Sequence, residues 1–146
     1  RGVALPVDLG ELARACAARP WPVPVEVAVT GEPIASGRSG QLAAAIENLV
    51  ANATQFANPG STVRVAIDGS IEPRGEHVRV TVTNHGPALS PTAQRKVWDR
   101  FYSTRVASGG SGLGLAIVRS VALAHGGSVG VSCSDGVTAF WFDVRI

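Results

Sequence analysis

The chain has 146 residues, of which 45% are hydrophobic and 16% are charged, and its 13 basic and 11 acidic side chains leave a formal net charge of +2. This length suits one domain, and the apolar content excludes a disordered chain. No apolar run approaches the roughly 20 residues of a membrane-spanning helix, and the basic residues form no cluster typical of nucleic-acid binding. Cys16 and Cys133 belong to no CxxC pattern, so we expect two free, reduced thiols. Because the chain begins with Arg1 and has no methionine, we expect it to be a piece of a longer protein.

The first part of the chain is expected to form two strands around one helix. Residues 3–7 are a short apolar run typical of an edge strand. Asp8 is suited to cap a helix, and Glu11 follows it at the spacing of a capping box. A proline cluster over residues 20–24 ends that helix. Residues 25–30 alternate valine with other residues, which predicts a half-buried strand.

A longer helix is predicted over residues 41–56, after a loop at residues 37–40. Its core-facing positions follow helical spacing and are Leu42, Ala45, Ile46, Leu49, Val50 and Ala53. The sequence Asn58-Pro59-Gly60 ends this helix.

The rest of the chain alternates strands with further helices. The predicted elements are strands at 63–67 and 78–82, a short helix at 91–97, a helix at 111–125, and strands at 128–132 and 137–146. Residues 103–112 are rich in glycine and serine. This order predicts an α+β fold, in which about three helices cover one face of a mixed, mainly antiparallel sheet of about five strands.

Three carboxamides follow one another along the helix predicted at residues 41–56. Asn48, Asn52 and Gln55 have the spacing i, i+4, i+7, so they share one side of the helix beside its apolar face. Asparagine is a poor helix former, so this row is either solvated surface or a set of amides that face a polar ligand. Carbonyl oxygens of this kind suit a hard cation such as Mg²⁺.

A turn follows the strand predicted at residues 78–82. Asn84 lies at the end of that strand and Gly86 follows it. Asn84 either caps the turn or reads the edge of a flat heterocycle, and the glycine allows a close approach of backbone or ligand.

A glycine-rich segment opens directly into the helix predicted at residues 111–125. Its sequence is Gly109-Gly110-Ser111-Gly112-Leu113-Gly114. The first N–H groups of a helix attract anions, so this segment is suited to phosphate. It is neither a Rossmann fingerprint nor a P-loop, because it lacks a closely preceding strand and a Gly-Lys-Ser/Thr ending.

In this order the motifs resemble the catalytic and ATP-binding domain of sensor histidine kinases, within the wider GHKL ATPase superfamily. The N box is matched by LAAAIENLVANATQF, the G1 box by VTNHGPALSP, the F box by VWDRFYSTR and the G2 box by GGSGLGLAIV. The resemblance covers nearly the whole chain and implies the two-layer α/β sandwich of the Bergerat fold. Residues 1–146 are then a single ATP-binding domain, the C-terminal part of a larger sensor kinase.

The resemblance implies a role for each candidate residue. Asn48 and Asn52 are expected to hold Mg²⁺ and to orient the triphosphate, and Asn84 to read the adenine edge. The further nucleotide contacts are Gln55, Phe56, Gly86, Leu89, Gly110, Gly112, Leu113 and Gly114. Asn48 and Arg105 are the expected catalytic residues, with Arg105 at the terminal phosphate. Residues 103–111 are expected to form an ATP lid that Phe101 anchors. For Phe101 and Trp98, packing in the core is the alternative to a role at the ligand.

Three positions depart from the family pattern. Asn84 stands where the G1 box usually has Asp, and an amide oxygen accepts without charge assistance, at a loss of about 1–3 kcal/mol. We therefore expect relaxed base selection. Ala88 replaces a glycine of the same box, and Gln55 stands where many members have a phosphate-contacting lysine. Arg105 is expected to compensate for that lost charge.

The reaction that the resemblance implies is transfer of the γ-phosphoryl group of ATP to a histidine on a separate domain. None of the histidines at positions 77, 85 and 125 lies in an acceptor motif. One alternative is a hydrolase or serine kinase of the same superfamily. Such members carry a glutamate base where this chain has Asn48, and Glu47 points about 100° away around the helix. A second alternative is a degenerate nucleotide-binding or scaffold module, motivated by the three departures.

The implied partners are the protein's own dimerisation and phosphoacceptor domain, in a homodimeric parent, and a cognate response regulator. We expect no nucleic-acid partner and a monomeric isolated domain. The implied location is the cytoplasm, including the cytoplasmic part of an inner-membrane sensor kinase.

Overall fold

The computed structural model describes residues 5–71, 76–100 and 113–146. The elements in these ranges are β1 (Leu5–Asp8), α1 (Leu9–Ala17), β2 (Val25–Thr30), β3 (Ile34–Gly37), α2 (Ser39–Phe56), β4 (Val63–Ile71), β5 (His77–His85), α3 (Pro91–Lys96), α4 (Gly114–Ala124), β6 (Val129–Ser134) and β7 (Val137–Arg145). No helix in these ranges is both long and apolar enough to cross a membrane.

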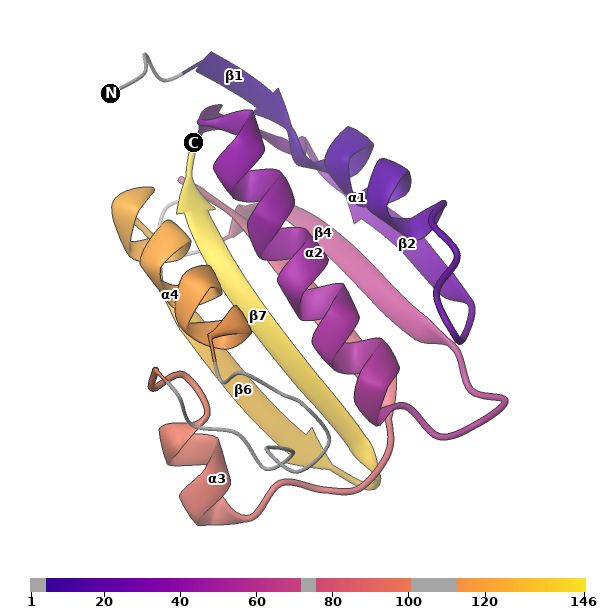
Figure 1. The fold of residues 1–146 in the computed structure, drawn as a ribbon. Helices are drawn as coiled ribbons and strands as arrows, with labels where there is room; N and C mark the ends of the chain where they lie inside the picture. The colour runs from indigo at the N-terminus through magenta and orange to yellow at the C-terminus, as the bar shows by residue number, and fades with distance from the viewer. Residues whose placement is uncertain (1–4, 72–75, 101–112) are drawn as a thin grey trace.

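The strands form one large sheet and one small one. The large sheet has five strands in the order β2-β4-β5-β7-β6, and β1 pairs with β3 in the small one. Only the β2–β4 pair of the large sheet is parallel; the other three pairs are antiparallel. Figure 1 shows α1, α2 and α4 over one face of the large sheet, with α3 near one end of it. The predicted α+β class and two-layer arrangement are confirmed.

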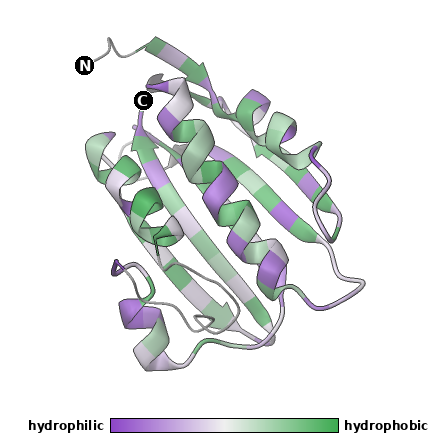
Figure 2. Cartoon of the chain, viewed as in Figure 1, coloured by the Kyte–Doolittle hydropathy of each residue, from purple (hydrophilic) through white to green (hydrophobic). Residues whose placement is uncertain are grey.

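The core lies between α2 and the sheet. All six positions of the predicted apolar stripe are at most 1% exposed, and Figure 2 shows the matching bands of apolar and polar residues along the helix and the strands. Burial of each leucine, isoleucine or valine of this stripe stabilises the fold by roughly 1.5–3 kcal/mol. The stripe predicted from helical spacing is confirmed.

The beginnings of the helices follow their local capping signals. At α1, the Asp8 Oδ1 accepts a hydrogen bond from the Glu11 N–H at 3.1 Å, as predicted. At α3, the Ser90 Oγ accepts from the Ala93 N–H at 3.0 Å, and Pro91 occupies the first turn. The short helix predicted at 91–97 is thereby confirmed to within one residue.

The loop predicted at residues 37–40 is wrong. Residues Ile34–Gly37 form β3, and α2 begins at Ser39 rather than at residue 41. The cause is long-range pairing, because β3 is held by β1 from the start of the chain, with Leu5 opposite Gly37 and Asp8 opposite Ile34. A four-residue strand has no periodicity long enough to reveal such a partner.

A tight hairpin joins β6 to β7. Asp135 and Gly136 both have positive φ, 52° and 77°, between the paired residues Ser134 and Val137. Asp-Gly is a preferred sequence for a two-residue turn of this kind. The two strands are confirmed with somewhat different bounds from those predicted.

Candidate functional site

The face of β5 and β7 that the helices cover ends in a polar pair. Along this face Val78, Val80 and Val82 lie opposite Val144, Phe142 and Phe140, and the fourth pair is Asn84 with Thr138. Asn84 is 2% exposed and Thr138 is 4% exposed. Burying a polar group is costly unless it is hydrogen-bonded. The polar pair at the end of this apolar row is therefore a candidate position for binding a ligand.

The four buried polar side chains differ in their partners. Thr54 donates to the Ala51 carbonyl, Thr138 lies 3.4 Å from the Cys133 Sγ, and Asp143 pairs with Arg79. For the side chain of Asn84, no hydrogen bond is found within the described parts of the chain. Of these four side chains among the described residues, Asn84 is therefore the one with hydrogen-bonding capacity left for a ligand; the Nδ1 of the half-buried His77 is a further buried atom without a partner.

The turn after Asn84 packs closely against the end of α2. A Cβ on Gly86 would lie 2.4 Å from the Phe56 carbonyl oxygen, so only glycine fits. The Asn58 N–H donates to the His85 carbonyl at 2.7 Å, and the Gly86 N–H donates to the Gly136 carbonyl at 3.0 Å. The sequence predicted a close approach at Gly86, and the group that approaches is the protein's own backbone.

Asn48 faces the first turn of α4. Its Nδ2 donates to the Ala44 carbonyl at 2.8 Å. Its Oδ1 lies on the opposite side, where a Cβ on Gly114 would come within 2.9 Å of it. The absence of a side chain at Gly114 therefore lets the helix start reach the amide oxygen. The Asn48 Oδ1, which is an acceptor, and the first N–H groups of α4, which are donors, therefore lie close together.

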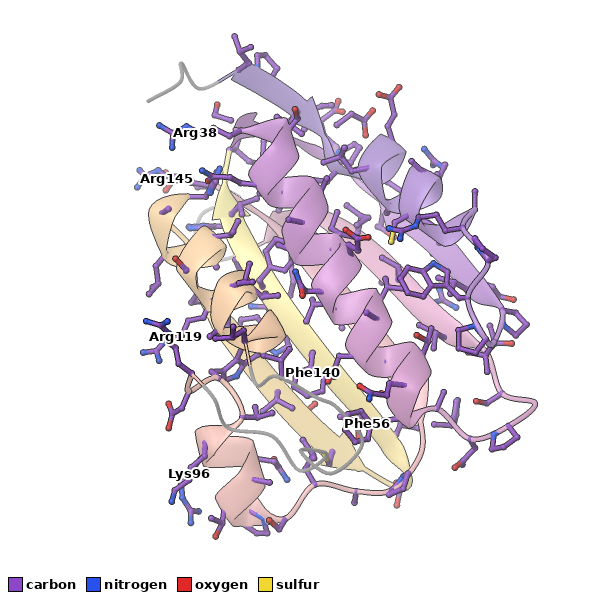
Figure 3. The ribbon with its side chains drawn as sticks, in the orientation of Figure 1. Arg38, Phe56, Lys96, Arg119, Phe140 and Arg145 are labelled. Atoms are coloured by element: carbon purple, nitrogen blue, oxygen red, sulfur yellow. The ribbon has the colours of Figure 1, made fainter. Side chains whose placement is uncertain are left out.

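The other candidates on α2 differ in exposure. Asn52 is half-buried one turn beyond Asn48, Phe56 is half-buried at the end of the helix, and Gln55 is exposed. Figure 3 shows Phe56 and Phe140 on the same, helix-covered side of the sheet. Of the three carboxamides, Asn48 and Asn52 are thus half-buried and Gln55 is exposed.

Leu89 and Trp98 lie on the chain that leaves β5. Leu89 is half-buried against the core, and its carbonyl accepts from the Gln94 Nε2 at 3.0 Å. Trp98 is 9% exposed and packs edge-to-face on Phe140, with ring centroids 5.6 Å apart. Core packing, one of the two roles considered for Trp98, is the one observed.

Some candidate residues lie outside the described part of the chain. They are Phe101, Arg105, Gly110, Gly112 and the proposed lid at residues 103–111. Of the glycine-rich segment, Leu113 and Gly114 are described, and Leu113 is the half-exposed N-cap residue of α4.

The oxygen atoms of the described candidate residues suit a cation only if a bound ligand supplies further oxygens. Among the described residues, no group of three or more His, Cys, Asp or Glu side chains is placed to hold a metal ion. The Asn48 Oδ1 is a suitable oxygen, since its amide nitrogen is already engaged by the helix. Mg²⁺ usually takes few protein ligands and completes its shell with water and substrate phosphates. An amide-based magnesium site therefore fits a phosphate-bearing ligand.

Thr138, the buried polar residue opposite Asn84, is not among the candidate residues predicted from the sequence. It was included in the strand predicted at residues 137–146, but its position opposite Asn84 depends on the register between β5 and β7. The available signal was alternation, since Thr138 shares its face with Phe140, Phe142 and Val144.

Comparison with known proteins identifies the class. Residues 37–146 match the family described as histidine kinase-, DNA gyrase B-, and HSP90-like ATPase. The chain therefore belongs to this ATPase family. Within the family, it is a catalytic domain of the sensor histidine kinase type, as its individual relatives indicate.

Two named relatives are mycobacterial. The chain is 41% identical over 97 residues to the signal transduction histidine-protein kinase/phosphatase MprB of Mycolicibacterium paratuberculosis, covering 65% of this chain and 18% of the relative. It is 38% identical over 99 residues to the sensor-like histidine kinase SenX3 of Mycobacterium bovis, covering 65% and 23%. The matched segment is thus only about a fifth of the length of these relatives.

Solved structures agree in fold over the whole chain. A mycobacterial sensor histidine kinase MprB matches with a TM-score of 0.83 and 31% identity, covering 98% of this chain and 97% of that one. Full-length ShkA in complex with AMPPNP matches with a TM-score of 0.81 and 30% identity, covering 97% of this chain and 30% of that one.

Proposed function

We propose that this domain binds Mg-ATP between α2, the end of β5 and the start of α4, and donates the γ-phosphoryl group to a histidine on a separate dimerisation and phosphoacceptor domain. The observation that carries the proposal is the buried, unpartnered Asn84 at the same sheet face over which Asn48 meets the start of α4. Family membership supports the use of ATP, and the likeness to sensor histidine kinases supports transfer to a histidine.

The roles of the residues follow from their chemistry. Asn84 reads the base, with Phe56 and Leu89 beside it and Gly86 keeping the turn close. Asn48 and Asn52 hold Mg²⁺, which supplies charge neutralisation at the phosphates. Gln55, Gly110, Gly112, Leu113 and Gly114 contact the phosphates, and Arg105 reaches the terminal one. In phosphoryl transfer the protein mainly positions groups and stabilises charge, which amides, helix N–H groups and one arginine can do.

The described histidines favour an acceptor on another domain. The His125 ring is held at both nitrogens, by the Arg38 N–H at 3.2 Å and the Val121 carbonyl at 2.8 Å. The His77 Nε2 lies 3.1 Å from the Gly126 carbonyl, and its Nδ1 is buried. His85 alternates with Asn84 along β5, so its ring leaves the opposite face of the sheet.

Glu47 is poorly suited to activate water. It pairs with Arg19, which extends from the segment after α1, and this ion pair holds its carboxylate away from the Asn48 side of the helix. This argues against the hydrolase alternative, in which a carboxylate must reach the attacking water.

The proposal extends to the parent protein. We infer that its other parts provide the acceptor domain, that this parent is a homodimer acting on a response regulator, and that the domain works in the cytoplasm as a monomeric unit tethered to its acceptor. No nucleic-acid partner is proposed.

Transfer of labelled phosphate tests this function. The chain is mixed with a purified cognate phosphoacceptor domain, Mg²⁺ and ATP labelled at the γ-position. Acid-labile label on the acceptor supports the kinase, and free phosphate alone supports a hydrolase. If neither product forms, the result supports the scaffold alternative.

A pair of variants on α2 makes the test specific. Asn48→Ala removes the proposed metal-binding oxygen, and we expect transfer to fall by at least about 10- to 100-fold, as for other losses at metal sites. Ala43→Ser, on the flank of the same helix that faces away from the row of carboxamides, is the matched control and is expected to transfer normally. Equal transfer by both variants would contradict the role of Asn48.

A further inference from the structure

Residue 84 combines near-complete burial with an unpaired carboxamide. Its neighbours are neutral: Thr138 lies opposite on β7, and a Cβ on Gly86 would lie 3.1 Å from the Asn84 Nδ2. Within the described parts of the chain, neither neighbour forms a hydrogen bond with the amide. The amide is therefore free to present its oxygen as an acceptor and its NH₂ group as a donor to whatever enters.

The two kinds of purine differ in what they offer at this position. A 6-amino purine such as adenine presents an N–H donor at position 6 and a ring-nitrogen acceptor at position 1. A 6-oxo purine presents the reverse, an oxygen acceptor at position 6 and an N–H donor at position 1. A carboxamide can satisfy either arrangement by exchanging the roles of its oxygen and its NH₂ group, whereas an ionised carboxylate can only accept.

We propose that Asn84 is a specificity-determining residue that lets this site bind 6-oxo purine nucleoside triphosphates, of the inosine and guanosine type, alongside ATP. This inference rests on the proposed nucleotide site and defines the class of nucleotide that the site takes. It follows from a neutral group that can both donate and accept, at a buried position beside two uncharged residues, Thr138 and Gly86.

Inosine triphosphate is the decisive probe. Inosine differs from adenosine only in the reversed groups at positions 6 and 1, whereas guanosine adds a 2-amino group that tests the room in the pocket. Isothermal titration calorimetry of the whole chain with Mg-ATP, Mg-ITP and Mg-GTP gives three values of Kd. We expect the Kd values for ATP and ITP to agree within about tenfold, since both bases are hydrogen-bonded.

The variant Asn84→Asp tests the assignment to this residue. A carboxylate repels the oxygen of a 6-oxo purine, so the ratio of the ITP and ATP dissociation constants should rise by roughly 5- to 150-fold, the range for a lost hydrogen bond or an unpaired buried group. The matched control is Thr83→Ser, on the opposite face of β5, for which the ratio stays at the wild-type value. Asn84→Ala, which adds no charge, is expected to weaken ATP and ITP to the same extent.

The outcomes separate this inference from the proposed function. Tight ATP binding with ITP binding weaker by more than about tenfold overturns the inference and leaves the ATP site intact. An unchanged ratio in Asn84→Asp, or a loss in Asn84→Ala that affects ATP alone, also overturns it. Failure of every nucleotide to bind the wild-type chain overturns the proposed function, and the inference with it.

Discussion

Two glycines of this domain show how differently the same residue is used. Gly130 on β6 lies under the Trp141 ring, and a Cβ there would be 2.0 Å from the Trp141 Cζ2. The Arg79 guanidinium lies over the same ring, 4.0 Å from its centroid, and Arg79 also pairs with Asp143 at 2.7 Å. Gly40, in the first turn of α2, has nothing within 4 Å of its virtual Cβ.

Alanine at these two glycines should therefore act in opposite directions. Gly130→Ala displaces the indole and disturbs its stack on Arg79, so we expect the free energy of unfolding to fall by about 1–3 kcal/mol. Gly40→Ala restricts the unfolded chain and favours the helix, so we expect a gain of about 0.4–1 kcal/mol. Urea titrations followed by circular dichroism measure both, and a stable Gly130→Ala variant would contradict the packing argument.

The two cysteines should differ in reactivity. Burial raises the pKa of the Cys16 thiol above its ordinary 9.0, an effect that Arg19 opposes and Glu47 reinforces. Cys16 is 8% exposed, whereas Cys133 is half-exposed on β6. Because the thiolate is the reactive species, iodoacetamide should label Cys133 before Cys16 at neutral pH, as measured by peptide mass spectrometry. Equal rates would be the contrary result.

The same shift makes a prediction about stability. The folded state holds the Cys16 proton more tightly than the unfolded chain does. The contribution of this proton to the free energy of unfolding is therefore fully present below pH 9.0 and is lost as the pH rises through the folded pKa. Cys16→Ala should flatten this alkaline loss of unfolding free energy relative to wild type.

At the scale of elements, α2 is tied down at both ends. Its last turn is held by the contacts of Phe56 with Gly86. At its start, the N–H of the N-cap residue Arg38 donates to the Nε2 of His125, the C-cap residue of α4, at 3.2 Å. Gly37 makes room for that ring, since a Cβ there would lie 2.6 Å from the His125 Cδ2. His125, at the end of α4, thus accepts a hydrogen bond at the start of α2, which has no side-chain cap from its own N-cap residue.

A double-mutant cycle tests this contact. His125→Ala leaves the Arg38 N–H without its acceptor and should cost about 1–2 kcal/mol of unfolding free energy. Gly37→Ala should also destabilise, because its new methyl group meets the ring. In the double variant the methyl group no longer collides with the imidazole, so the combined loss should be smaller than the sum. Strict additivity in chemical denaturation would refute the contact.

Local sequence patterns predicted those elements whose cause is local. The stripe of α2, the Asp8 cap and the alternation of β5 each arise from neighbouring residues, and each is confirmed. β3 was not predicted, because its four residues are held by β1. Asn84 was predicted as a site residue, but Thr138, which lies opposite it on β7, was not, because their proximity depends on the register of two strands far apart in sequence. The contact between Gly37 and His125 was hidden for the same reason.

At the scale of the whole molecule, the N-terminal elements complete the core although they lie before the segment that matches the ATPase family. Leu9 and Ala13 of α1 are fully buried, and β2 pairs with β4 along its length. A chain of residues 37–146 should therefore lose its cooperative thermal transition. A melt of that chain, monitored by near-ultraviolet circular dichroism beside the full one, checks this, and equal transitions would contradict it.

The single parallel pair, β2 with β4, has a topological consequence. Parallel neighbours cannot be joined by a tight turn, and here the crossover between them consists of β3 and α2. The helix that carries Asn48 and Asn52 is therefore the connection of a β-α-β unit, and its position is set by closure of a long loop of chain. The proposed binding amides and the sheet should then form in one cooperative step, so that a partly folded chain without β2 in place lacks the proposed nucleotide site.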